Sequence, residues 1–225
     1  MRTALETVGR VLLFAALLGL VLWPLELLWP HRVPRLTPRA WLADLGCLLL
    51  GALALRLLVD PLLAALAARV PARPATAWRL GASLLGAELC AYALHRAMHE
   101  IPWLWRLHAV HHAPRELDWM KAWRQHPIEV ALHALVVAVP GLLVGAPLAG
   151  LGALWLLRRG YTALLHANVD LRLPPGRLEL LGQLVATPAF HRAHHSHDPR
   201  LHNSNYASTF PLLDRLFGTY RPGAG

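Results

Sequence analysis

Five long apolar segments constrain the fold of this chain more than any other feature. They cover residues of about 8–28, 41–70, 78–98, 128–144 and 147–165. A helix needs roughly 20 apolar residues to cross a bilayer, and helices pair their backbone groups internally, as lipid requires. Hydrophobic residues make up 56% of the sequence and charged residues 16%, which is more apolar than an average soluble domain. The sequence therefore predicts an all-α integral membrane protein, a helical bundle of four or five hydrophobic helices.

The first two segments carry local signals. Arg2 and Arg10 precede the first apolar run as in a signal peptide, but the run extends to about Trp29 and no small-residue cleavage site follows. We therefore expect a retained span. In the second segment, Arg56 and Asp60 have the spacing of an ion pair on one helix face. The adjacent Pro61 predicts a kink, or a division into two half-length pieces.

The net charge of +9 comes from 22 Lys and Arg against 13 Asp and Glu. The arginines flank the apolar segments and form no basic stripe with interleaved aromatic residues, so we expect no nucleic-acid partner. Both cysteines, Cys47 and Cys90, lie inside apolar segments and form no Cys-x-x-Cys pair. A disulfide framework or a thiolate metal site is therefore not expected.

Three histidine clusters follow one another in the second half of the chain. Thirteen of the 14 histidines lie at or after position 95, and the clusters have the forms His-x3-His, His-x2-His-His and His-x2-His-His. Residues three or four apart share one helix face, and neutral imidazole is a common ligand for iron, zinc and copper. Each triplet can bind one ion with two rings and a neighbouring ion with the third. The members of the clusters are His95, His99, His108, His111, His112, His191, His194 and His195.

Other polar and aromatic residues have candidate roles around these clusters. His126 begins the fourth segment and His166 ends the fifth, so we expect both at the same membrane face and count them as ligands. The isolated His31, His133, His197 and His202 are expected to be ordinary surface or core residues. Partners that orient the imidazoles, unless they are only capping or solvated residues, are Asp118, Glu129, Asn168 and Asn205. Two roles are open for Trp103, Trp105, Trp119 and Trp123, as headgroup-level anchors or as the lining of a substrate entry, and we favour anchoring.

The order of the motifs resembles that of a known family. His-x3-His, His-x2-His-His, Arg-x-His-Pro-x-Glu, His-x-Asn and His-x2-His-His follow one another, and residues 205–210 and 214–220 also match. Over about residues 88–222 the chain is similar to the fatty acid hydroxylase / sterol desaturase superfamily of membrane non-haem diiron enzymes. The resemblance implies two iron ions held by the histidines above, with O2 as co-substrate. It implies hydroxylation or desaturation of a C–H bond in a lipid, such as a sterol or a fatty acyl chain.

The resemblance also suggests an organisation of the chain. Residues 1–79 are expected to form N-terminal membrane helices and residues 80–225 a catalytic domain with a histidine-rich, metal-binding cap. The expected location is a multi-pass position in a membrane, the inner membrane if the source is bacterial. The turn at Gly145 carries no charge, so the basic side that holds the site should be cytoplasmic. Basic residues on that side are Arg106, Arg115, Lys121, Arg124, Arg172 and Arg177.

Two further hypotheses stay open at this point. A non-catalytic membrane protein could retain the histidines for metal binding alone. A metal transporter would need ionisable residues at mid-membrane, for which Arg56, Asp60 and Glu88 are the main candidates, and we rank it last. No haem or iron–sulfur domain is recognisable in the sequence, so an enzyme of this kind would need a separate redox donor protein. The sequence leaves the lipid, the choice between alcohol and alkene, and the oligomeric state open.

Overall fold

The computed structural model describes residues 2–33, 38–74, 76–170 and 176–222, and these residues form helices and no β-strand. Pro30 and Val169 form an isolated antiparallel β-bridge, which joins the end of the first apolar segment to the residues after the fifth. Helices along the chain are α1 (Arg2–Leu28), α2 (Pro38–Ala54), α3 (Asp60–Ala67), α4 (Ala77–Glu100), α5 (Pro102–His112), α6 (Pro127–Leu143), α7 (Leu148–His166), α8 (Arg177–Leu184), α9 (Pro188–His194) and α10 (Leu212–Leu216). A π-helical turn spans Leu55–Val59, and 3-10 turns span Trp119–Trp123 and Pro199–Leu201.

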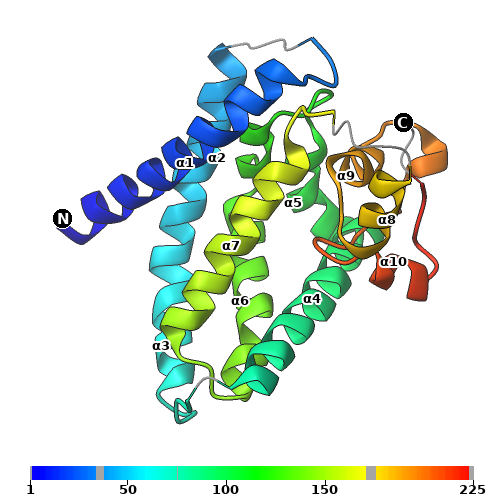
Figure 1. Cartoon of the computed structure of the whole chain (residues 1–225). Coiled ribbons are helices and arrows are strands. Elements are labelled where there is room, and N and C mark those ends of the chain that lie inside the picture. Colours follow the sequence, from blue (N-terminus) through cyan, green and yellow to red (C-terminus); the bar gives the residue numbers. More distant parts are fainter. Residues whose placement is uncertain (1, 34–37, 75, 171–175, 223–225) are drawn as a thin grey trace.

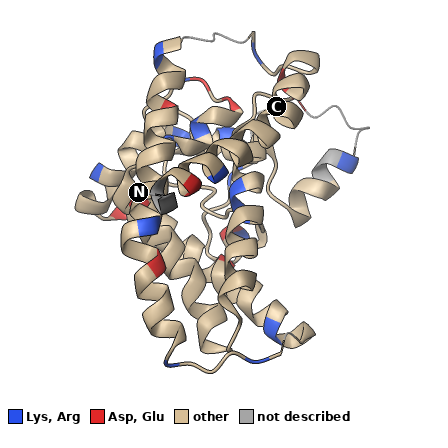
Figure 2. Ribbon diagram, turned by 90° about the vertical axis from the view of Figure 1, so that its left-hand side faces the viewer, with Lys and Arg blue, Asp and Glu red and all other residues tan. Residues whose placement is uncertain are grey.

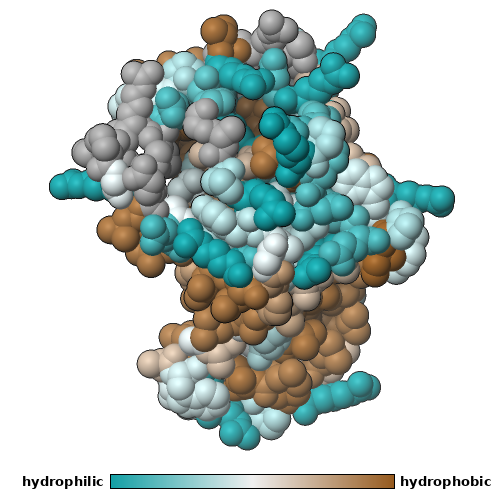
Figure 3. Space-filling view, turned by 90° about the vertical axis from the view of Figure 1, so that its right-hand side faces the viewer, coloured by the Kyte–Doolittle hydropathy of each residue, from teal (hydrophilic) through white to brown (hydrophobic). Residues whose placement is uncertain are grey.

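The molecule has an apolar bundle and a polar cap. Helices α2, α3, α4, α6 and α7 run along the bundle, whereas α5, α8, α9 and α10 gather at one end of it (Figure 1). The bundle surface is mostly hydrophobic below the hydrophilic cap (Figure 3). By length and composition two helices could cross a membrane, Leu5–Leu28 and Pro38–Ala67, and the shorter Pro127–Leu143 is also apolar. The predicted all-helical class is confirmed, while the count of four or five spans stays a prediction.

The second apolar segment is one continuous helix from Pro38 to Ala67, so Pro61 does not divide it. A proline cannot donate to the carbonyl four residues before it, and its ring crowds that carbonyl. Here the π-helical turn Leu55–Val59 precedes Pro61 and contains that carbonyl, which belongs to Leu57. The wider turn accommodates the proline inside a helix. The predicted pair of Arg56 and Asp60 is confirmed, with Nη1 and Oδ2 3.2 Å apart at an exposed position.

Small residues bring the bundle helices into close contact. A Cβ added to Gly86 of α4 would lie 2.5 Å from Cβ of Pro140 in α6, and a Cβ added to Gly51 would lie 3.3 Å from Val130. Ala87 and Ala91 of α4 are fully buried on the same side. Without side chains in the way, the backbones of α2, α4 and α6 can approach one another, as is usual between helices in lipid. The bundle is therefore a tight scaffold beneath the cap.

A break after α4 positions the next helix. Ile101 is extended, with φ −102° and ψ 116°, because the residue before a proline is disfavoured in the helical region. Pro102 then begins α5 at a position where its missing N–H is not needed. The chain changes direction there, and α5 places its histidines against those at the end of α4.

The end of α1 is anchored in the cap by a buried carboxylate. One oxygen of Glu26 accepts hydrogen bonds from the backbone N–H groups of Trp119 and Asn168, each at 2.8 Å. Trp119 and Trp123 are 4% and 3% exposed and pack in the core next to α1 and α7, so the prediction that they are headgroup anchors is wrong. The 3-10 turn Trp119–Trp123 folds these large rings inward. Trp103 and Trp105 are exposed, as an interfacial role would require.

Candidate metal centre

Nine histidines from four parts of the chain meet where the cap joins the bundle. They form two groups, and within each group the potential ligand atoms lie within 4.8 Å of one another. Group one contains His95, His99, His108, His112 and His194. Group two contains His111, His166, His191 and His195, all buried. Each His-x2-His-His box is thus divided between the groups, which lie side by side because neighbouring residues of one box belong to different groups.

The ring nitrogens of each group converge on one central histidine. In group one, Nε2 of His108 lies 3.1 Å from Nε2 of His95 and 3.2 Å from Nε2 of His112. In group two, Nε2 of His166 lies 3.1 Å from Nε2 of His111 and 3.2 Å from Nε2 of His191. In both groups, therefore, the ring atoms that face one another are Nε2 atoms.

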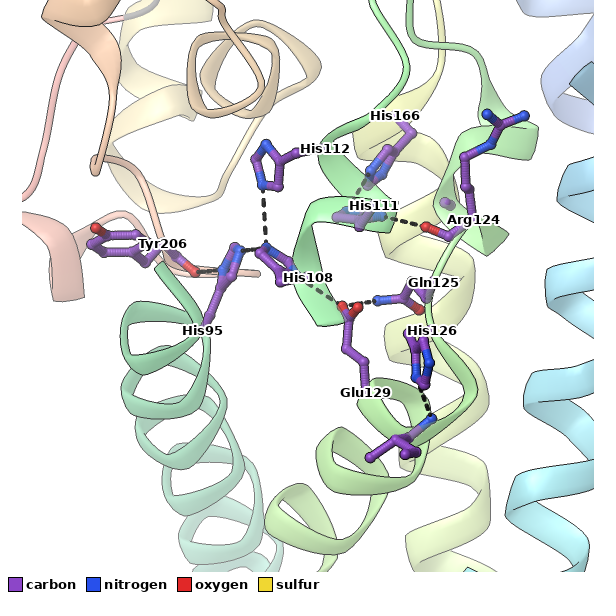
Figure 4. Close-up of polar contacts among 12 residues, drawn as sticks. His95, His108, His111, His112, Arg124, Gln125, His126, Glu129, His166 and Tyr206 are labelled. Atoms are coloured by element: carbon purple, nitrogen blue, oxygen red, sulfur yellow. Dashed lines mark hydrogen bonds and ion pairs between the residues drawn. The ribbon is translucent and has the colours of Figure 1, made fainter. Parts of the chain in front are cut away.

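The outer nitrogens of five rings are held by oxygen acceptors, and the contacts of His95, His108 and His111 can be followed in Figure 4. Nδ1 of His95 lies 2.7 Å from the carbonyl of Tyr206, and Nδ1 of His108 lies 2.9 Å from Oε1 of Glu129. The other three pairs join His111 to Arg124 at 3.1 Å, His166 to Thr162 at 2.8 Å and His194 to Ser204 at 2.7 Å, each through a backbone carbonyl. A carbonyl can only accept, so in these carbonyl-bound rings Nδ1 carries the proton and Nε2 has a free lone pair.

This tautomer makes the groups suited to a cation. His111 and His166 face each other with two Nε2 lone pairs 3.1 Å apart, a contact that cannot be a hydrogen bond and that a positive ion would relieve. The histidines of α5 and α9 have pKa values well below 6.5. The main cause is burial, and the second is the proximity of the other histidines. These rings are therefore neutral, the form that binds metals. The residues present fit metal ions with nitrogen preference.

The loop that supplies two of the carbonyls is itself braced. Asp214 accepts hydrogen bonds from the backbone N–H groups of Tyr206 at 2.7 Å and Ala207 at 2.9 Å. Asn205 has a left-handed φ of 58°, which asparagine tolerates, and its side-chain amide donates to the carbonyls of Phe190 and Arg221. The carbonyls of Ser204 and Tyr206 are thereby fixed against His194 and His95.

Only one of the four predicted orienting residues contacts an imidazole. Glu129 holds His108, whereas Asn205 braces the loop just described. The side chain of Asn168 ties down the backbone of Arg32, accepting from its N–H at 3.1 Å and donating to its carbonyl at 2.8 Å. Asp118 caps the turn Trp119–Trp123 and pairs with Lys121 at 2.7 Å. The carbonyl acceptors could not be found from sequence, because every residue has a carbonyl and only the fold selects four of them.

The structure does not bring His126 into either group. Its Nδ1 accepts a hydrogen bond from the backbone N–H of Ile128 at 3.2 Å and thereby caps α6. Pro127 fixes the helix start there, so the ring folds back onto its own helix (Figure 4). The geometry therefore does not support the predicted role of His126 as a ligand. Arg172, counted in the topology prediction, lies outside the described residues.

His133, expected to be an ordinary residue, lies beside group one. Its ring centroid is 6.4 Å from that of His95, and it lines a cavity of about 60 Å³ on the bundle side of the histidines. Arg158 and Arg159 line the same cavity; Arg158 pairs with Glu88, and Arg159 donates to Gln125 at 2.6 Å. Glu129 and His133 are four residues apart and therefore share one face of α6. This spacing is visible in the sequence and could have indicated that His133 lies near the site.

Comparison with known proteins gives one family and several relatives. The family model described as fatty acid hydroxylase matches residues 80–219. Ornithine lipid hydroxylase OlsE of Rhizobium tropici is 33% identical over 64% of this chain and 42% of its own length. Alkylglycerol monooxygenase of Danio rerio is 30% identical over 65% of the chain and 31% of its own length.

A putative methylsterol monooxygenase of Dictyostelium discoideum is 29% identical over 68% of the chain and 54% of its own length. The chain thus spans about a third to a half of the length of the relatives that it matches. No solved structure matches.

Proposed function

Because the chain belongs to the fatty acid hydroxylase family, within the fatty acid hydroxylase / sterol desaturase superfamily, we propose that it is an O2-dependent membrane oxidoreductase that hydroxylates or desaturates a C–H bond of a lipid. The observation that carries the proposal is the pair of adjacent histidine groups with inward-facing Nε2 atoms. Relatives named as hydroxylases and monooxygenases support an oxidative reaction. Their substrates differ, so the lipid has to be identified for this chain.

We propose that each group holds one iron ion, group one through five rings and group two through four. Bound iron would supply the activation of O2 and the oxidation of an unactivated C–H bond, chemistry that side chains alone cannot perform. The protein residues have other tasks. In five of the nine rings the backbone carbonyls and Glu129 would keep Nδ1 protonated and Nε2 directed inward.

The substrate and the redox donor are proposed as separate partners. The lipid would approach from the membrane that surrounds the apolar bundle (Figure 3). Electrons would come from a separate redox donor protein.

The test is metal content measured together with turnover. The purified protein should contain about two iron ions per chain and should consume O2 in the presence of a reducing donor and lipid. His108→Ala and His195→Ala each remove a ring from one group and should abolish oxidation and lower the metal content, while His126→Ala, outside both groups, should retain both. Full activity with one ion per chain would refute the dinuclear proposal. Two ions per chain without lipid oxidation under any donor would instead favour a non-catalytic metal-binding protein.

We also propose that the cap faces the cytoplasm and that the bundle crosses the membrane several times. Lys and Arg residues gather mostly at the cap end (Figure 2), and the positive-inside tendency would place such an end in the cytoplasm. In a variant without Cys47 and Cys90, a membrane-impermeant thiol reagent should label Arg200→Cys in the cap only from the cytoplasm. It should label Ala72→Cys, exposed at the opposite end, only from outside. Labelling of both from one side would refute the crossing.

A further inference from the structure

A large open cavity lies on the cap side of the histidines, opposite the small one. It has a volume of about 710 Å³, and its lining comes mainly from residues 31–33, the start of α2, residues 114–124, and α9 with the residues after it. His195 of group two forms part of its wall. The cavity is thus a polar chamber with direct access to a proposed metal ligand.

The charge of the lining is positive once the internal ion pairs are removed. Lys121 bonds Asp44 at 2.8 Å and Asp118 at 2.7 Å, and Arg124 bonds Asp44 at 2.5 Å, so these four charges compensate one another. Asp198 is paired with Arg200, and Glu26 accepts two backbone N–H groups. The cations that then remain in the wall are Arg32, Arg115 and Arg192, against the carboxylates Glu26 and Glu116.

Two of these arginines are built into the same segments as the histidine ligands. Arg192 follows His191 directly in α9, and its guanidinium donates to the carbonyl of Val169 at 3.0 Å. The backbone of Arg32 is fixed at both its N–H and its carbonyl by the side chain of Asn168, two residues after His166. The positive wall is therefore held in a fixed relation to group two.

Arg32 and Arg192 lie close enough to repel each other, and both disfavour the charged form of His31. Burial first, and then the charges of Arg192 and Arg32, lower the pKa of His31 below its usual 6.5. The nearby Asp170 attracts Arg192, whereas Arg32 repels it. A fold that brings like charges together beside an open chamber gains from an anion that binds between them.

We propose that this cavity binds the anionic group of a charged lipid headgroup, a phosphate or a carboxylate, and so selects charged lipids over sterols and neutral glycerolipids. The inference rests on the proposed function, because it names the substrate class of the same centre. Guanidinium groups bind such oxyanions through paired, charge-assisted hydrogen bonds. Arg192 and His195 both line the cavity, so a headgroup bound there would lie beside group two.

The test measures binding without turnover. The iron-loaded full chain, in a neutral detergent and without oxygen, is titrated with dioctanoyl phosphatidylglycerol, dioctanoylglycerol, N-octanoylglycine and inorganic phosphate. We expect phosphatidylglycerol or N-octanoylglycine to bind at least tenfold more tightly than dioctanoylglycerol, and phosphate alone to bind weakly. Arg192→Gln and Arg32→Gln should each weaken the binding of the charged lipid about tenfold, since each removes a charge-assisted bond. Arg69→Gln removes the same charge from an exposed position at the far end of the bundle and should change nothing.

Metal content distinguishes this inference from the proposed function. Equal binding of dioctanoylglycerol and the charged lipids would overturn the headgroup site, as would unchanged binding in both arginine variants with full metal content. Phosphate that binds as tightly as the charged lipids would show a site for a soluble anion and would also overturn it. A protein that oxidises no lipid but loses charged-lipid binding in Arg192→Gln would keep the headgroup site and refute only the oxidase.

Discussion

Removal of the Glu129 carboxylate should weaken metal binding by group one. Glu129 is fully buried, its Oε1 lies 2.9 Å from Nδ1 of His108, and His108 is the ring on which that group converges. In Glu129→Ala the buried N–H of His108 loses its acceptor, at a cost of about 1–3 kcal/mol. A tenfold change in affinity corresponds to about 1.4 kcal/mol, so we expect the metal affinity to fall by about 10- to 100-fold, the usual effect of losing such an orienting partner.

The assay is competition for metal between the protein and a chelator of known affinity, without oxygen. Glu129→Gln keeps an oxygen that can accept from His108 and from Gln125, which donates to Glu129 at 3.0 Å, so its loss should be less than tenfold. The matched control is His126→Ala, three residues earlier, which removes a helix cap and should lower the free energy of unfolding by about 1 kcal/mol without changing metal affinity. Wild-type metal affinity in Glu129→Ala would refute the reasoning, as would equal losses in the Ala and Gln variants.

The remaining predictions concern stability, measured as the free energy of unfolding in detergent. Asp44→Ala removes the fully buried carboxylate that lies between Lys121 and Arg124, leaving Lys121 with Asp118 alone, and should cost about 3–5 kcal/mol. Asp60→Ala, which breaks an exposed pair in the same long helix, should cost less than about 1 kcal/mol, and similar values would contradict the burial argument. Gly86→Ala forces a methyl group against Pro140 and should cost about 1–3 kcal/mol, while Gly81→Ala in the same helix meets nothing within 4 Å and should be neutral or stabilising. The metal-free protein should lose stability as the pH falls below 6.5, because the pKa values of the α5 and α9 histidines are lowered by folding and the unfolded chain then binds more protons. Thermal unfolding at pH 7.5 and 5.5 measures this effect, and equal midpoints would contradict it.

The histidine pattern shows how far sequence reasoning reaches. The spacings of three and four place the rings of each box on one helix face, and that is a local property of the chain. Which rings share a group depends on the angle between α4, α5 and α9, which is set by the extended Ile101 before Pro102 and by the braced loop around Asn205. The direction of His126 is also decided by the fold, because its ring caps the start of α6 and lies in neither group. His133, four residues after Glu129 on the same face of α6, lies beside His95.

By itself the sequence determined the helical class, the positions of the apolar segments, the ion pair of Arg56 and Asp60, and the set of clustered histidines. These follow from hydrophobicity and helical period, which act between near neighbours. Only the tertiary structure decided that Trp119 and Trp123 are buried, that backbone carbonyls orient four of the rings, and that Arg32 and Arg192 meet beside His195. Those contacts join residues far apart in sequence, and they exist because the packing of the bundle and cap brings the segments together.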